Sequence, residues 1–90
     1  MAQLARHHFG WVGQGFNPGV EHNWWFGPIS FGDVVYVTAH PVTLVPREAM
    51  IKDIRAHVDQ AGNRTLLFTV RNTGVNTING YGLDFSVVSG

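Results

Sequence analysis

Two stretches of the chain alternate apolar and polar residues with a period of two, and this pattern constrains the fold more than any other feature. In the first, residues 65–71, Leu66, Phe68 and Val70 fall on one face of an extended chain. In the second, residues 81–88, the apolar set is Tyr81, Leu83, Phe85 and Val87. A period of two is that of a β-strand with one buried face. Both stretches are therefore predicted to be strands.

Three more strands are expected upstream. Residues 33–42 carry apolar or β-branched side chains on both faces, which predicts a central strand covered on both sides. Residues 7–12 and 21–26 fit short strands joined by a loop rich in Gly and Asn at 13–19. Most of the eleven glycines separate short apolar runs, which is typical of an all-β domain.

Residues 46–61 fit either a helix or a strand. A helix would have Pro46 at its first position and Gly62 as its stop. A strand would place Met50, Ile54, Ala56 and Val58 on one face. The strand is favoured because a turn at 60–63 would then lead straight into the strand at 65–71 and make a compact hairpin.

The length and these elements together predict one domain. Ninety residues suffice for a single core, and two cores would each be too small to bury enough surface. The expected fold is a small antiparallel β-sandwich, immunoglobulin-like, with one short helix around 46–61 as the alternative to a strand. Residues 33–90 would form the sandwich core, and the Trp- and Gly-rich residues 1–32 would form an interface.

The charge content argues for association. Only 13% of the residues are charged and the formal net charge is zero, against a usual charged share of about 25%. Electrostatic repulsion would not keep copies apart, so we expect a homo-oligomer or burial against a partner. The six Lys and Arg residues are spread singly, which argues against nucleic-acid binding.

Membrane insertion and classical secretion are not expected. The sequence has no apolar run approaching the roughly 18 residues of a spanning helix. The first residues lack the apolar stretch of a secretory signal, so we expect a cytoplasmic protein or export by a non-classical route.

The stretch Leu66-Leu67-Phe68-Thr69-Val70-Arg71-Asn72-Thr73-Gly74, followed by a polar loop and Gly80-Tyr81-Gly82-Leu83-Asp84-Phe85, carries a family resemblance. From about Asp53 onward the chain resembles a bacterial immunoglobulin-like sandwich of the adhesion-associated CARDB type. Such domains often show a strand ending in Val-x-Asn-x-Gly before an alternating strand. The resemblance implies an extracellular or adhesive role, and the Trp-rich first third departs from it.

Trp24 and Trp25 form the candidate binding site. Adjacent residues of a strand point to opposite faces, so the two indoles cannot share one core. The ring left outside would be covered by a nearby loop, anchor an interface or stack on a sugar ring. The full set of candidate binding or interface residues is Trp11, Phe16, Asn17, His22, Asn23, Trp24 and Trp25.

The sequence does not predict an enzyme. Its serines lack a nucleophile elbow, it has no cysteine, and its carboxylates show no paired spacing. The five histidines show no spacing for convergent ligands, so we expect no metal and no cofactor, although histidines could make assembly pH-sensitive. The favoured interpretation is a structural module that self-associates through aromatic and strand-edge surfaces. The alternative is a carbohydrate-binding module that uses Trp24 or Trp25.

Overall fold

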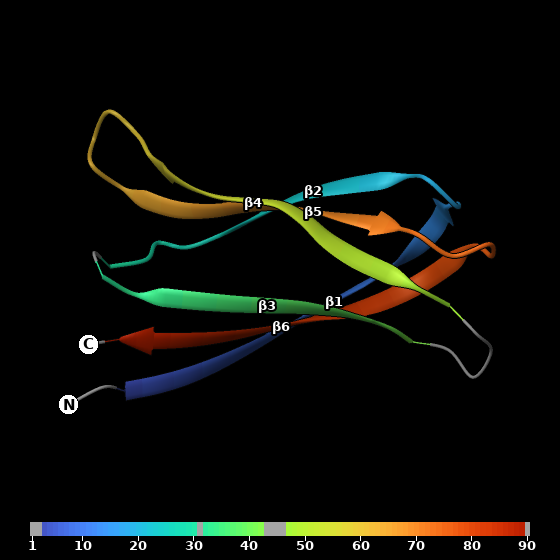
Figure 1. Cartoon of the computed structure of the whole chain (residues 1–90), viewed down its shortest axis with the longest axis horizontal. Coiled ribbons are helices and arrows are strands. Elements are labelled where there is room, and N and C mark those ends of the chain that lie inside the picture. The colour runs from blue at the N-terminus through green and yellow to red at the C-terminus, as the bar shows by residue number, and fades with distance from the viewer. Residues whose placement is uncertain (1–2, 31, 43–46, 90) are drawn as a thin grey trace.

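The chain folds into six antiparallel strands arranged in two layers (Figure 1). The computed structural model describes residues 3–30, 32–42 and 47–89. One sheet has the strand order β1–β6–β3 and the other has the order β2–β5–β4. The strands are β1 (Gln3–Phe16), β2 (Glu21–Phe26), β3 (Val34–Pro41), β4 (Ala49–Val58), β5 (Arg64–Asn72) and β6 (Ile78–Ser89). The predicted small all-β sandwich is confirmed.

The two central strands supply most of the core. The two alternating stretches of the sequence lie in β5 and β6, each between two other strands. Their inward faces meet between the sheets, where each large side chain taken fully out of water stabilises the fold by about 1.5–3 kcal/mol. The buried core consists of Phe16, Leu66, Phe68, Val70, Ile78, Tyr81, Leu83 and Phe85.

Residues 49–58 form strand β4, so the favoured strand is confirmed and the alternative helix is wrong for these residues. Pro46, the expected first residue of that helix, lies outside the described residues. The predicted shared face is also wrong. A β-bulge between Lys52 and Arg55 shifts the register, and Asp53 there has a positive φ of 54°. Because a bulge adds one residue to the strand, Met50, opposite Arg71, lies on the outer face of the sheet, whereas Ala56, opposite Leu66, lies on the inner face.

The sequence had suggested that β3 is a central strand, but β3 lies at the edge of its sheet. It pairs only with β6 among the described strands, and Val34 and Tyr36 on its outer face are exposed. The β-branched and aromatic residues on that face suit a pleated strand whether or not another layer covers them. Apolar residues on both faces therefore did not mean burial on both faces here.

Strand β1 is longer than predicted. It runs past the expected end at Val12 to Phe16, with a register shift against β6 between these two residues. Gly15 has a φ of 83° in this stretch, a conformation that glycine adopts without strain. The expected loop at 13–19 is thereby reduced to a tight turn after Phe16. The longer strand β1 places the Phe16 ring in the core.

Asn72 fixes the end of β1 against the loop between β5 and β6. This side chain is 1% exposed, and its Nδ2 donates to the carbonyl oxygens of Phe16 (2.9 Å) and Asn76 (2.8 Å). Its Oδ1 accepts a bond from the Gly74 amide at 3.0 Å. One buried amide therefore bonds three backbone groups, two carbonyl oxygens and one N–H.

Strands β1 and β6 come from opposite ends of the sequence. Gln3 pairs with Ser89, and the pairing continues inward along both strands. The two ends of the chain consequently lie side by side at one end of the sandwich (Figure 1).

Candidate functional site

The hydroxyl of Tyr81 is the centre of an aromatic cluster between the sheets. It lies 2.7 Å from Nε1 of Trp24 and 2.8 Å from Nδ1 of His22. Trp11 stacks on the Tyr81 ring at a centroid distance of 5.2 Å, and Phe16 stacks on His22 at 4.1 Å. Four of the predicted site residues thus converge on a tyrosine that the sequence analysis had assigned only to the core.

The two hydrogen bonds of Tyr81 favour one protonation state of His22. An indole N–H can only donate, so the Tyr81 oxygen accepts the bond from Trp24 and its own hydrogen is free to reach Nδ1 of His22. A neutral imidazole accepts that hydrogen. Burial agrees with this assignment, because it lowers the pKa of His22 and raises the pKa of the Tyr81 hydroxyl. The cluster is a neutral, satisfied network.

Trp25 points the other way, as predicted from strand geometry. It is 65% exposed on the outer face of the β2–β5–β4 sheet, opposite Leu67 of β5. Asn23 faces the same side, and its Oδ1 accepts a 2.9 Å bond from Thr69 Oγ1. The predicted set of site residues is therefore divided between the core and this outer face.

Asn17 belongs to neither group. It lies in the turn between β1 and β2, where its Oδ1 accepts a 2.8 Å bond from Thr77 Oγ1. This contact joins the turn to the start of β6, so the structure gives Asn17 a role in holding two loops together.

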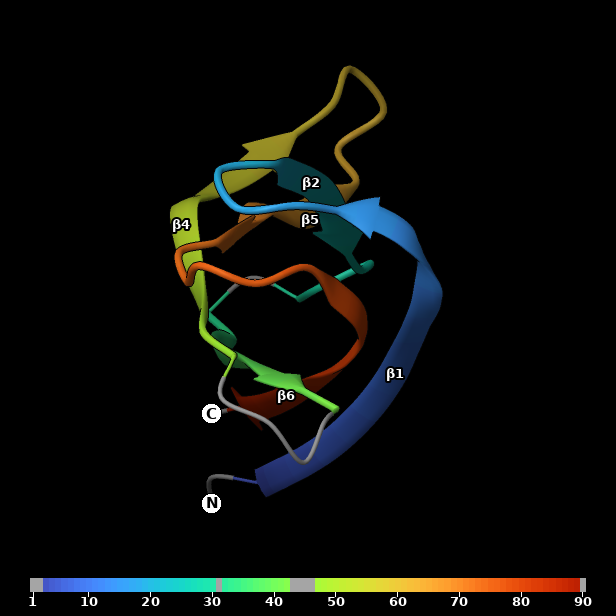
Figure 2. The same ribbon diagram turned by 90° about the vertical axis from the view of Figure 1, so that its right-hand side faces the viewer.

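Strands β1 and β2 are edge strands on the same side of the sandwich (Figure 2). An apolar cleft is lined by residues of both strands and of β6. Its volume is about 280 Å³. The Phe26 ring stacks on Phe85 at 4.2 Å, and Phe9, which is half exposed, meets Phe85 edge-on at 5.8 Å. The residues that line the cleft are Phe9, Trp24, Trp25, Phe26, Gly27 and Phe85.

The outer face of the β1–β6–β3 sheet carries an acid between two histidines. Asp84 Oδ1 lies 2.8 Å from His8 Nδ1, and Asp84 Oδ2 lies 3.4 Å from His40 Nε2. Thr38 Oγ1 lies 2.9 Å from the same nitrogen of His40. The hydrogen bond with His8 lowers the pKa of Asp84, so this carboxyl is ionised at neutral pH.

Register explains why these residues meet. His8 of β1, Asp84 of β6 and Thr38 of β3 stand directly opposite one another in a single row across the sheet. In the next row Gly10 faces Gly82, and Gly82 also faces His40. Gly80 and Gly82 share one face of β6 with Asp84. These alternating glycines were the sequence signal that could have pointed to this outer face as a candidate site.

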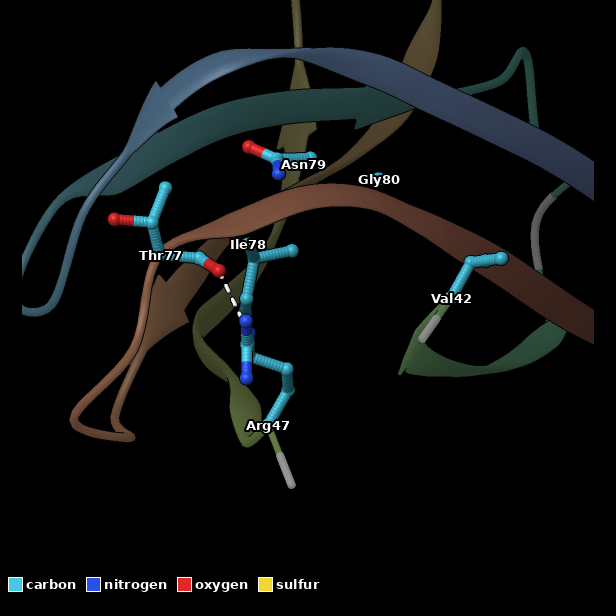
Figure 3. Close-up of a pocket in the computed structure, with 6 residues that line it drawn as sticks. All are labelled: Val42, Arg47, Thr77, Ile78, Asn79 and Gly80. Atoms are coloured by element: carbon cyan, nitrogen blue, oxygen red, sulfur yellow. Dashed lines mark hydrogen bonds between the residues drawn. The ribbon is translucent and has the colours of Figure 1, made fainter. Parts of the chain in front are cut away.

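A small polar pocket of about 60 Å³ lies at the start of β6 (Figure 3). Arg47 Nε donates a 2.7 Å hydrogen bond to the carbonyl oxygen of Thr77. Asn79 projects to the opposite side of β6 from Arg47, and Val42 lies to the right in the view (Figure 3). The pocket has room for water-sized molecules only, and its arginine holds the chain rather than a ligand.

Within residues 3–30, 32–42 and 47–89, no group of three or more His, Asp or Glu side chains is placed to hold a metal ion. The same residues contain no helix long and apolar enough to cross a membrane.

The fold and these surfaces define a six-stranded antiparallel β-sandwich with an aromatic centre and an apolar cleft at one open side. No family model matches the sequence, and no curated protein or solved structure was found to resemble it.

Proposed function

We propose that this domain is a non-enzymatic assembly module whose copies associate through the free edge of β1 and the cleft beside it. The observation that carries the proposal is the edge of β1. This strand is 14 residues long and pairs only with β6 among the described strands. Its single charged residue is Arg6, and it contains no proline. Exposed strand edges of this kind are templates for pairing with another chain.

The other edges are better protected. Strand β4 carries a β-bulge together with Lys52, Asp53 and Arg55, and bulges and charges are the usual devices that prevent edge pairing. Strand β2 has six residues and runs into Pro28. Strand β3 has eight residues, ends in Pro41 and lies against β4. Length and lack of protection single out β1.

The apolar cleft is a second feature that favours a partner at the edge of β1. Phe9 of β1 lines it and is half exposed, and Trp25 at its other side is mostly exposed. Contiguous exposed apolar surface on a small protein commonly marks an interaction site. A strand added to β1 would extend the sheet at the side where the cleft opens, so one partner could cover both features.

The partner that fits these features is a second copy of this chain. Two copies of β1 can pair antiparallel about a two-fold axis, which is the commonest symmetry of homo-oligomers. With the axis at Phe9, each Arg6 stands opposite a Val12, so the charged side chains do not oppose each other. The zero net charge of the chain leaves no general repulsion between copies.

Light scattering coupled to size-exclusion chromatography over a concentration series tests the proposal. We compare the wild type with the double variant Leu4→Lys/Val12→Lys, which adds two charges to exposed positions of β1. The matched control is Val42→Lys/Val75→Lys, which adds the same charge at exposed positions outside β1. The wild type and the control should associate and the β1 variant should be monomeric, with circular dichroism showing that all three are folded.

Two outcomes contradict this function. A wild type that stays monomeric at every concentration removes it outright. Equal dissociation of the two double variants would mean that net charge, and not the edge of β1, governs association.

A second candidate, glycan binding, is supported by the exposure of Trp25. Its flat indole lies on the same outer face as Asn23, whereas Trp24 is held inside by Tyr81. A glycan array probed with wild type, Trp25→Ala and Trp24→Ala tests it. Loss of binding should be confined to Trp25→Ala as long as Trp24→Ala remains folded, and no binding by the wild type ends this hypothesis.

A further inference from the structure

The inward face of β1 is only partly covered by the rest of the chain. Phe9 of β1 stands opposite Leu83 of β6, and opposite residues of an antiparallel pair share one face of the sheet. Phe9 is nevertheless 50% exposed, whereas Leu83 is 1% exposed. The apolar face that forms the core on β6 therefore continues onto β1 and loses its cover there.

Phe9 lies between two places where rings of β1 and β2 meet. On one side the rings of His7 and Phe26 have centroids 5.5 Å apart, and on the other the rings of Trp11 and His22 have centroids 4.7 Å apart. The ring contact that Phe9 makes among the described residues is with β6, on its own sheet. His7 and Trp11 are thus packed against β2, while the Phe9 ring between them borders the cleft.

The cleft has room for one more aromatic ring. Its volume is about 280 Å³, and a cavity of about 150 Å³ is already enough to hold benzene. No charged side chain lines it. An apolar ring can therefore enter without covering a charge.

Antiparallel pairing of two β1 strands brings such a ring to this place. A two-fold axis perpendicular to the sheet keeps the inward faces of both copies on one side, so the axis must pass through a residue. With the axis at Phe9, Phe9 of the second copy stands directly opposite, with Cβ atoms about 4.5–5.5 Å apart. An axis one residue earlier would put Phe9 opposite His7, and an axis one residue later would put it opposite Trp11. The rings of those two residues are already packed against β2.

Given the proposed pairing of β1, on which this step rests, we infer that the β1–β2 cleft is a composite site that Phe9 of the second copy closes. Each Phe9 lines the cleft of its own chain and closes the cleft of the other. The two rings stand together at the centre of the interface, where a few buried residues carry most of the binding free energy. Phe9 is then the anchor of the association, and the flanking residues of β1 set its register.

Disulfide trapping tests the register, because the chain has no cysteine of its own. With the axis at Phe9, Arg6 of one copy stands opposite Val12 of the other, at a Cα separation of about 4.5–5.5 Å that a disulfide can span. A mixture of Arg6→Cys and Val12→Cys chains should form the mixed disulfide dimer at least tenfold faster than either variant dimerises alone. Both positions are exposed and lie outside the cleft. Arg6→Cys mixed with Val75→Cys is the control and should show no such preference, since Val75 is exposed outside β1.

Phe9→Ala tests the anchor. The dissociation constant of the dimer, measured by light scattering over a concentration series, should rise at least tenfold. Tyr36→Ala, which removes an exposed ring from β3, should change it less than twofold. Circular dichroism reports whether both variants are folded. In the wild type, isotope-filtered NMR on a mixture of labelled and unlabelled chains should show contacts from the Phe9 ring to Trp24 and Phe26 of the other copy.

The outcomes separate this site from the assembly function itself. A wild type that is monomeric at every concentration overturns both. A wild-type dimer that Leu4→Lys/Val12→Lys dissociates, but that folded Phe9→Ala does not weaken, keeps the function and overturns the role of Phe9. A dimer without the mixed disulfide between Arg6→Cys and Val12→Cys, or without contacts from Phe9 to the other copy, overturns the composite site in the same way.

Discussion

Nε1 of Trp24 donates a 2.7 Å hydrogen bond to the hydroxyl of Tyr81. This bond explains which of the two neighbouring indoles lies inside. An indole brought between the sheets needs an acceptor for its N–H, and Tyr81 supplies one from the central strand of the facing sheet. Trp25 has no such requirement, because water reaches it.

Tyr81→Phe should destabilise the fold. The ring would remain, but Trp24 Nε1 and His22 Nδ1 would both lose their partner in a half-buried place. We expect a loss of about 1–3 kcal/mol in the free energy of unfolding, measured by urea denaturation. Tyr36→Phe is the control, because Tyr36 is 63% exposed and should change stability by less than about 0.5 kcal/mol. Equal effects of the two substitutions would contradict the role given to the Tyr81 hydroxyl.

The two tryptophans should differ in the same measurement. Trp24→Ala removes a ring that packs against the core and should cost about 3 kcal/mol. Trp25→Ala removes an exposed ring and should cost less than about 0.5 kcal/mol in a monomer. The comparison is best made at low protein concentration, so that any loss of association does not enter. A larger cost for Trp25→Ala would mean that the rings are placed the other way round.

Asn72→Ala should be among the more damaging polar substitutions. It leaves the Phe16 carbonyl without its side-chain donor and the Gly74 amide without its acceptor. A cost of about 2–3 kcal/mol is expected. Asn76→Ala provides the comparison, because the bond between Asn72 and residue 76 uses the Asn76 main-chain oxygen, which this substitution keeps. Thermal unfolding should therefore show a large shift for the first variant and little for the second.

His22 should make stability depend on pH. Burial lowers its pKa below the usual 6.5, so the unfolded chain binds this proton more strongly than the folded protein does. Its contribution should be constant above pH 6.5 and should decrease stability as the pH falls from 6.5 through the lowered pKa. His22→Gln should lack this part of the decline in urea unfolding between about pH 5 and 8. Identical pH profiles for the two proteins would contradict the assignment.

The pKa of Glu21 affects a different pH range. The hydrogen bond from Lys52 lowers this pKa below its usual value of 4.5. Stability from the ion pair is therefore complete above pH 4.5 and is lost as the pH falls through the lowered value. The two groups can be told apart by the pH at which the decline begins.

Local alternation was enough to predict where the strands lie and which residues share a face in β2, β5 and β6. It identified β5 and β6, the inward position of Phe68 and Tyr81, and the divergence of Trp24 and Trp25. These features depend only on the twofold repeat of an extended chain, which each segment carries in its own residues.

Strand order and the meeting of distant residues could not be predicted in this way. The edge position of β3 depends on which strands pair, and nothing within residues 34–41 specifies that. The bulge at Asp53 changed the face of Met50 although the composition of β4 gave no sign of it. The bond between His22 and Tyr81 joins residues 59 positions apart, so only the folded register brings them together.

The pairing of Gln3 with Ser89 has a consequence for how the chain is made. The first strand cannot find its neighbour until the last one has been synthesised. At about 5–20 residues per second that interval is on the order of 4–15 s. Throughout it, Phe9 and Trp11 lack their partners on β6, and structures built from such non-local pairings form slowly. The nascent chain is therefore most vulnerable to misassembly at β1, the strand that later forms the open edge of the sandwich.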